Sequence, residues 1–138
     1  MHLIGTLPPR IPDKQGSGDW HASRAGGTRK HKGVDYDAPV GFVLHAPVTG
    51  VVTKLGYPYE DDLSFRYVEI TDPGGSKYRC FYVKPIVKLG CHVIANQTPI
   101  GTVQNVASRA EGMSNHVHFE IQRGSRHVDP RLKSIKRV

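Results

Sequence analysis

The sequence predicts an all-β fold: a mainly antiparallel β-sheet, sandwich-like in form, with little helix. Fifteen glycines and ten prolines divide the chain into short segments, many of them rich in β-branched and aromatic residues. No long apolar stripe recurs at helical spacing. With 138 residues, the chain is long enough for one compact domain with its own core and too short for two ordinary ones.

The chain divides into an irregular arm over residues 1–25, a folded domain over 26–132 and a basic tail over 133–138. The arm is rich in Gly, Pro, Ser and charge and shows no periodicity, and we expect Trp20 to pin it to the body. Inside the domain, strands are expected at residues 42–46, 48–55, 65–70, 77–84, 93–94, 99–103 and 116–122.

Two connections between these strands carry distinct signals. Asp72-Pro73-Gly74-Gly75 has proline and glycine where a tight turn needs them. Within the expected strand at 48–55, Gly50 should form a bend or bulge. Residues 104–115 have no strand pattern and lead directly into the last strand. We expect this loop to form a wall of a substrate cleft, with a solvated connection of no special role as the alternative.

The last expected strand carries two histidines on one face. Apolar residues at 117, 119 and 121 alternate with His116, His118 and Glu120, which is typical of a strand with one buried face. Both histidines therefore project away from the core. One ring can bind a metal ion while the other lies beside it as a base.

A second pair, His31 and Asp35, comes about a quarter of the way along the chain. In an extended chain their side chains would lie roughly 13 Å apart, too far to share one ion. Gly33 allows the bend that they need, because glycine adopts conformations closed to other residues. With His118, the pair would give two nitrogens and one oxygen to a zinc ion and leave a fourth position for water, as in catalytic zinc sites. Since the chain has eight histidines, the alternative for each is an ordinary hydrogen-bonded residue.

Cys80 and Cys91 form neither a CxxC pair nor a disulfide framework. We expect reduced thiols that do not bind the metal, with a single bridge between them as the alternative.

The formal net charge of +7 and the pI near 9.6 favour a polyanionic neighbour, which could be nucleic acid, an anionic membrane surface or the anionic polymers of a bacterial wall. Nucleic acid is the weakest of these, because the basic residues are spread along the chain without a pattern of aromatic platforms. No segment predicts a transmembrane span. Residues 1–4 are followed by Gly, Pro and Arg, so we expect no signal peptide.

Over residues 26–132, these motifs resemble the lysostaphin-type, LytM-like zinc metallopeptidases, endopeptidases of bacterial peptidoglycan. The residues that carry the resemblance are 29–35 (RKHKGVD), 38–41 (APVG), 46–52 (APVTGVV), Gly90, Val93, Gln97, 100–101 (IG), 116–121 (HVHFEI) and 128–130 (VDP). The resemblance implies a β-sheet fold with the site in a groove, a zinc ion held by His31, Asp35 and His118, and His116 as an active-site histidine.

One position departs from the family pattern. Such enzymes usually carry a second active-site histidine in a Tyr-x-His motif, and here Lys84 stands in its place, in the segment 81–86 (FYVKPI). This segment is similar to one in the leukocyte-derived chemotaxins, vertebrate relatives that keep the zinc site without an established hydrolytic role. A lysine ammonium can stabilise an oxyanion, and beside a divalent cation its pKa should fall, so a neutral lysine acting as a base is conceivable. We expect Tyr82 to lie on the same strand face as Lys84, where its hydroxyl could donate a hydrogen bond to a transition state; the alternative is a tyrosine that only packs against its neighbours.

The sequence thus leads to the hypothesis of a zinc-dependent endopeptidase of peptidoglycan peptides, with His116 and Lys84 as catalytic residues and Tyr82 and Asn115 as substrate-binding residues. The alternative is a zinc-containing binding or structural module that has lost catalysis at position 84. The size, the charge and the expected lack of a signal peptide suit a bacteriophage endolysin that is cytoplasmic until lysis, or a virion protein with virion or tail assembly partners.

Overall fold

The structure is a computed structural model that describes residues 23–24, 29–30 and 33–130, with side chains described from residue 33 onward. The predictions for Trp20, for His31, for most of the arm and for the basic tail lie outside these residues.

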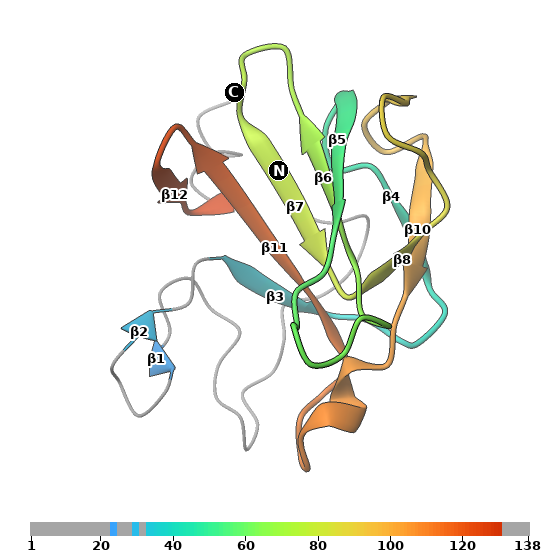
Figure 1. Cartoon of the computed structure of the whole chain (residues 1–138), viewed down its shortest axis with the longest axis vertical. Coiled ribbons are helices and arrows are strands. Elements are labelled where there is room, and N and C mark those ends of the chain that lie inside the picture. Colours follow the sequence, from blue (N-terminus) through green and yellow to red (C-terminus); the bar gives the residue numbers. More distant parts are fainter. Residues whose placement is uncertain (1–22, 25–28, 31–32, 131–138) are drawn as a thin grey trace.

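The described chain is nearly all antiparallel β structure, as predicted (Figure 1). The strands are β1 (Ser23–Arg24), β2 (Arg29–Lys30), β3 (Val34–Asp37), β4 (Val43–His45), β5 (Gly50–Gly56), β6 (Tyr67–Thr71), β7 (Lys77–Phe81), β8 (Val83–Pro85), β9 (His92–Val93), β10 (Pro99–Val103), β11 (His116–Arg123) and β12 (Arg126–Val128). A single turn of 3₁₀ helix, η2 (Val106–Arg109), lies in the loop before β11.

The strands form two main sheets. The larger sheet has the order β12-β11-β7-β6-β5-β9, and β3 also pairs with β11. β3 pairs with residues 116–119 of β11 and β12 with residues 121–123, so the two short strands share one long partner. The smaller sheet has the order β4-β10-β8, and β1 and β2 pair with each other.

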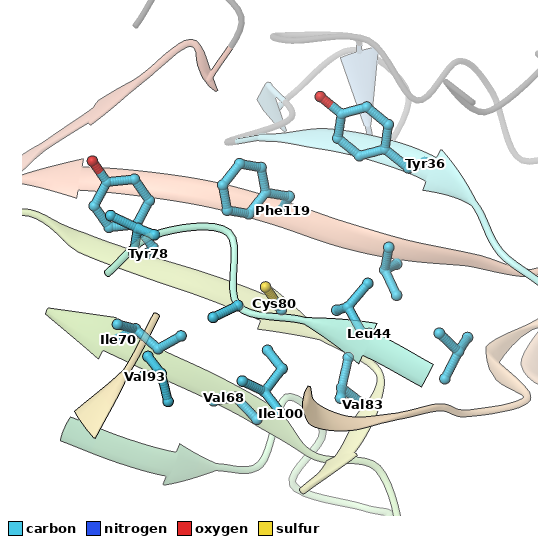
Figure 2. Packing of buried hydrophobic residues seen from close by; sticks show 14 of the residues in the cluster. Tyr36, Leu44, Val68, Ile70, Tyr78, Cys80, Val83, Val93, Ile100 and Phe119 are labelled. Atoms are coloured by element: carbon cyan, nitrogen blue, oxygen red, sulfur yellow. The ribbon is translucent and has the colours of Figure 1, made fainter. Parts of the chain in front are cut away.

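The core lies between the two main sheets (Figure 2). Leu44, Val83 and Ile100 of the small sheet are fully buried, as are Val68 and Cys80 of the large sheet. Because side chains alternate along a strand, the opposite face of the large sheet carries the polar residues. On β11, the residues at 117, 119 and 121 are in the core, as the alternation predicted.

The strand expected over residues 77–84 is in fact two strands. β7 ends at Phe81 in the large sheet, and β8 begins at Val83 in the small sheet. Tyr82 lies between them with φ 71°, and the amides of Tyr82 and Val83 both donate to the Arg66 carbonyl. The expectation that Tyr82 shares a strand with Lys84 is therefore wrong, because this left-handed residue transfers the chain from one sheet to the other.

Smaller differences concern local irregularities and short strands. The bulge of β5 lies between Val52 and Lys54 rather than at Gly50. The expected turn at residues 72–75 is present, with Gly75 at φ 88°. The short strands β3 and β12 were not predicted. None of the helical structure in the described residues has the length or hydropathy of a membrane span.

Candidate metal and catalytic site

Pairing between β3 and β11 brings the two predicted motifs together. Asp35 lies directly opposite His118 in the strand register, and Asp37 lies opposite His116. Gly33, at the bend before β3, permits this approach: a Cβ there would lie 2.2 Å from the Phe119 carbonyl oxygen. The sequence predicts a bend at Gly33, and in the structure this glycine also lets the two backbones approach closely.

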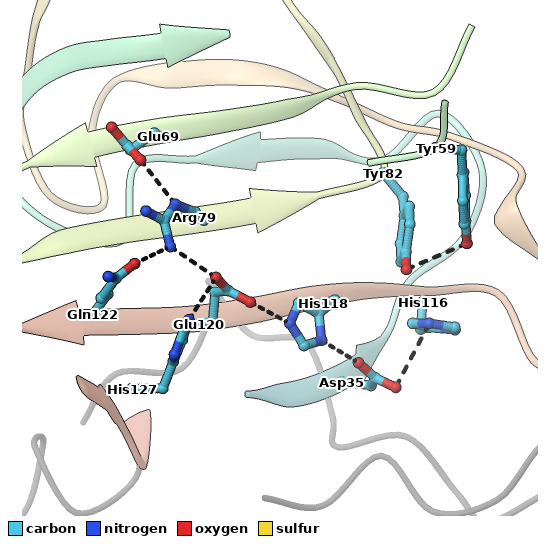
Figure 3. Close-up of polar contacts among 10 residues, drawn as sticks. All are labelled: Asp35, Tyr59, Glu69, Arg79, Tyr82, His116, His118, Glu120, Gln122 and His127. Atoms are coloured by element: carbon cyan, nitrogen blue, oxygen red, sulfur yellow. Dashed lines mark hydrogen bonds and ion pairs between the residues drawn. The ribbon is translucent and has the colours of Figure 1, made fainter. Parts of the chain in front are cut away.

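Asp35 contacts both histidines (Figure 3). Its Oδ1 lies 3.1 Å from Nδ1 of His118, and its Oδ2 lies 3.6 Å from Nε2 of His116. The carboxylate is buried, with 3 % of its side chain exposed. A buried carboxylate needs cationic or hydrogen-bonding partners, and these two rings supply them.

The Asp35 and His118 atoms fit a zinc ion. Two ligands at about 2.0–2.1 Å from zinc, at a tetrahedral angle, lie about 3.3 Å apart, close to the separation of Oδ1 and Nδ1. Among the residues that the structure describes, no group of three His, Cys, Asp or Glu side chains is arranged to hold a metal ion. The described residues therefore supply two of the three predicted ligands, and the third, His31, lies outside them.

The other nitrogen of His118 is held by Glu120. Nε2 lies 2.9 Å from Oε1 of Glu120, and the Phe81 ring packs edge-on against the imidazole at 5.0 Å. Burial alone would lower the pKa of His118, but its hydrogen bonds and charge interactions with Asp35 and Glu120 outweigh burial and raise the pKa to about 9. The ring is thus fixed on both sides by carboxylates.

His116 has a different environment. Its Nδ1 lies 2.9 Å from the Ser114 carbonyl oxygen, which can only accept a hydrogen bond. Nδ1 therefore carries a proton, and in the neutral ring Nε2, on the Asp35 side, is the basic nitrogen. This is the tautomer that a general base directed toward Asp35 requires.

Tyr82, a predicted substrate-binding residue, packs against His116. The two rings meet edge to face at 5.5 Å, and the Tyr82 hydroxyl lies 3.4 Å from that of Tyr59 (Figure 3). A non-glycine residue with φ 71° is uncommon, and such strain is concentrated at functional sites. The left-handed backbone of Tyr82 accompanies the placement of its ring beside His116.

Two loops form an aromatic wall beside Tyr82. Tyr59 stacks on Tyr82 and meets Phe65 edge-on, and the Arg109 guanidinium lies 3.7 Å above the Tyr59 ring. Arg109 also pairs with Asp61 and Asp62. These contacts of Arg109 hold the loop at residues 104–115, which was expected to form a cleft wall, against the β5–β6 loop. Tyr59 was not predicted as a residue of the site, because it is distant in sequence and lies in no motif.

Lys84 and Asn115, two further predicted site residues, lie in environments that differ from that of Tyr82. Lys84 is exposed on β8 opposite Thr102, and it forms no ion pair with any described residue. The Asn115 amide donates to the carbonyls of Ala38 and Gln104 and accepts from the Ala107 amide. Its side chain ties the loop to β3, and only its oxygen has room for another bond. The structure thus brings together Asp35, His116, His118 and Tyr82.

Comparison with known proteins gives the family. Residues 29–130 match the family model described as Peptidase family M23. The structure is similar to lysostaphin, an antimicrobial peptidase from Staphylococcus simulans, with 19% identity and a TM-score of 0.67 over 97% of this chain and 54% of that chain. It is also similar to a zinc-containing peptidase from Vibrio cholerae, with 22% identity and a TM-score of 0.63 over 94% of this chain and 40% of that chain.

A third similar structure is a mutant of the catalytic domain of the prophage-encoded M23 protein EnpA from Enterococcus faecalis, with 25% identity and a TM-score of 0.63 over 92% of this chain and 97% of that chain. The chain thus has about the length of this catalytic domain and spans about half or less of the first two proteins. The family model covers most of the chain, including Asp35 and both histidines of β11. The chain belongs to peptidase family M23.

Proposed function

We propose that this protein is a zinc-dependent endopeptidase that acts on peptidoglycan peptides. The observation that carries the proposal is the convergence of Oδ1 of Asp35 and Nδ1 of His118, 3.1 Å apart, with His116 on the other oxygen of the same carboxylate. Membership of the peptidase family supports hydrolysis. The zinc-containing peptidase from Vibrio cholerae supports the choice of metal.

In this proposal Asp35, His118 and His31 hold the zinc ion. When bound, the metal polarises the scissile carbonyl and lowers the pKa of its bound water. His116 accepts a proton from the attacking water through Nε2. This nitrogen is available because the Ser114 carbonyl holds the ring's own proton on Nδ1. Asp35 lies between the two rings and contacts both of them.

Two side chains are candidates for the donor that stabilises the oxyanion. The sequence favours Lys84, whose ammonium stands where the family usually has a second histidine. The geometry favours Tyr82, since its ring contacts His116. A hydroxyl or an ammonium can each donate to the developing charge. Asn115 is a further proposed substrate contact through its carbonyl oxygen, and it positions the loop that precedes β11.

The nature of the substrate rests on the relatives and on charge. Lysostaphin is named as an antimicrobial peptidase, and EnpA is named as prophage-encoded. A chain with a net charge of +7 suits approach to an anionic cell wall. We therefore also propose that this protein is a bacteriophage endolysin or virion protein and that it acts in the bacterial cell wall.

Digestion of purified peptidoglycan, with mass spectrometry of the products, tests the activity. The wild type should release cleaved peptides, and His118→Ala, with a proposed ligand removed, should release none. Equal product from both proteins would show that the cleavage does not come from this site.

The second candidate function is a zinc-containing binding module without hydrolysis. The observation that favours it is Lys84, which replaces the usual histidine and is exposed on β8. Such a module would bind peptidoglycan and zinc and release no product in the same digestion. Product from the wild type alone would exclude it.

A further inference from the structure

A row of charged side chains, two of them buried and one partly buried, crosses the polar face of the large sheet and ends at His118 (Figure 3). Glu69 on β6, Arg79 on β7 and Glu120 on β11 are direct neighbours in the strand register. The side chains of Glu69, Arg79 and Glu120 are 6%, 16% and 9% exposed. None of the three belongs to the catalytic residues proposed above.

The hydrogen bonds of the row are short and continuous. Arg79 donates from Nε to Oε2 of Glu69 at 2.8 Å and from Nη1 to Oε2 of Glu120 at 2.9 Å. The same Nη1 nitrogen donates to Oε1 of Gln122 at 2.6 Å. With Oε2 of Glu120 held by the guanidinium, Oε1 is directed to Nε2 of His118 at 2.9 Å.

Stability alone is a poor reason for such a row. A buried ion pair is often no more stabilising than apolar residues of the same size, because both charges lose their hydration. A planar guanidinium, however, holds its donors in one rigid arrangement, so the bond from Nε to Glu69 fixes the direction of the bond from Nη1 to Glu120. The row is therefore better suited to orient His118, the residue at its end, than to stabilise the fold.

We propose that Glu120, held in place by Arg79, is a positioning residue that orients His118 with Nδ1 toward Asp35. The inference rests on the zinc site of the proposed function. By accepting from Nε2, Glu120 keeps the proton on that nitrogen and leaves Nδ1 as the metal ligand. Carboxylates behind ligating histidines fix both the tautomer and the ring angle in this way.

Zinc affinity, measured by competition with a chromophoric chelator, tests the proposal without any assay of activity. Glu120→Gln should weaken zinc binding by about 10–100-fold, because one amide oxygen cannot serve both Arg79 and His118. Glu69→Gln is the matched control, because it replaces the other carboxylate that accepts from Arg79, one strand farther from His118. Its amide oxygen can still accept from Nε of Arg79. Glu60→Gln, at an exposed position, controls for the loss of one negative charge.

Both control variants should bind zinc within about threefold of the wild type, below the range expected for partners of a ligand. If Glu120→Gln kept full affinity, or if Glu69→Gln lost as much, the positioning role would be overturned. Arg79→Lys should give a partial loss, since it keeps the charge and loses the planar fork.

Nitrogen-15 NMR of histidine side chains gives a second measurement, in the wild type itself, should the variants fail to fold. In the zinc-loaded protein the His118 proton should reside on Nε2. A proton on Nδ1, with the metal on Nε2, would contradict the inference. A wild type that binds zinc in a Glu120-dependent way but cuts no peptidoglycan would retain the inference and refute the proposed activity. A wild type that binds no zinc would refute both.

Discussion

At the scale of single residues, the sharpest question is which side chain would stabilise the oxyanion in the proposed hydrolysis. Tyr82 contacts His116, while Lys84 is exposed on the neighbouring strand of the small sheet. Removing a single oxyanion donor typically costs about 10²–10³-fold in turnover. We therefore expect one of Tyr82→Phe and Lys84→Ala to lower kcat by that factor with zinc still bound.

Steady-state kinetics on a soluble peptidoglycan peptide, together with zinc analysis of each variant, separates the two residues. A loss confined to Tyr82→Phe would assign the role to the tyrosine and remove Lys84 from the mechanism. If both variants were as active as the wild type, His116 and the metal would carry the chemistry alone.

The two cysteines should differ in reactivity. Cys80 is fully buried in the core, and burial raises the pKa of its thiol to about 12, while Cys91 is exposed. Because the thiolate is the reactive form, a thiol reagent should modify only Cys91 in the native protein and both cysteines after denaturation. Rapid modification of both thiols in the native protein would contradict the burial of Cys80. Replacing both cysteines with serine should leave zinc binding intact in a folded variant.

The sequence predicts the local geometry of the candidate site better than its surroundings. The alternation around His116 and His118 is local, so it correctly indicates one strand face, and the spacing of Asp35 correctly indicates a bend before it. Tyr59 and Arg79 could not be found in this way, because they reach the site through strand pairing and loop packing between distant segments. No short pattern in the sequence records such contacts.

At the scale of elements, the site depends on the close approach of β3 to β11. A Cβ at position 33 would overlap the backbone of Phe119, whereas at Gly74 the nearest atom would be Asp72 Oδ1, at the ordinary distance of 3.5 Å. We expect Gly33→Ala to reduce the free energy of unfolding by about 1–3 kcal/mol, as overpacking does, and to weaken zinc binding by displacing Asp35. Denaturant titration and zinc competition measure the two effects.

Gly74→Ala is the control, and it should change neither quantity. A Gly33→Ala variant with normal stability and normal zinc affinity would show that β3 can move away from β11 without consequence for the site.

The break between β7 and β8 illustrates what the sequence leaves open at this scale. Residues 77–84 alternate like one strand, and nothing local marks Tyr82 as left-handed. The break occurs because the chain leaves the large sheet after Phe81 and joins β10 of the small sheet, with the Arg66 carbonyl accepting from both amides at the corner. A change of sheet is a tertiary event, and strand periodicity does not encode it.

At the scale of the whole molecule, the row of charged side chains that ends at His118 predicts a pH dependence of stability. Burial alone would raise the pKa of Glu69, but hydrogen bonds from Thr53 and Arg79 outweigh it and lower the pKa below its ordinary value of 4.5. The ionised Glu69 carboxylate therefore stabilises the fold fully at pH values above its ordinary pKa of 4.5. This contribution disappears as the pH falls through the lowered pKa of the folded protein.

The difference in unfolding free energy between the wild type and Glu69→Gln should thus be constant near neutral pH and shrink in acid. Denaturant unfolding over a pH series measures this difference. A difference that stayed constant into strong acid would mean that Glu69 is not ionised in the folded protein.

The positive charge of the molecule predicts how it would approach the proposed substrate, the bacterial cell wall. Attraction between a chain of net charge +7 and an anionic wall is screened by salt, with a Debye length of about 10 Å at 0.1 M and about 3 Å at 1 M. Adsorption of the protein to whole cell walls should therefore fall steeply over this range. Cleavage of a short neutral peptide should change little, and equal salt dependence of both would exclude steering by the wall.

The central claim is that Asp35 and His118, joined by His31, form a zinc site, and zinc content measured by atomic spectroscopy tests it most directly. The wild type should carry one zinc ion per chain. His31→Ala, Asp35→Ala and His118→Ala should each lose it, while Glu60→Gln should retain it. Full zinc content and unchanged affinity in the three ligand variants would contradict this assignment of the ligands.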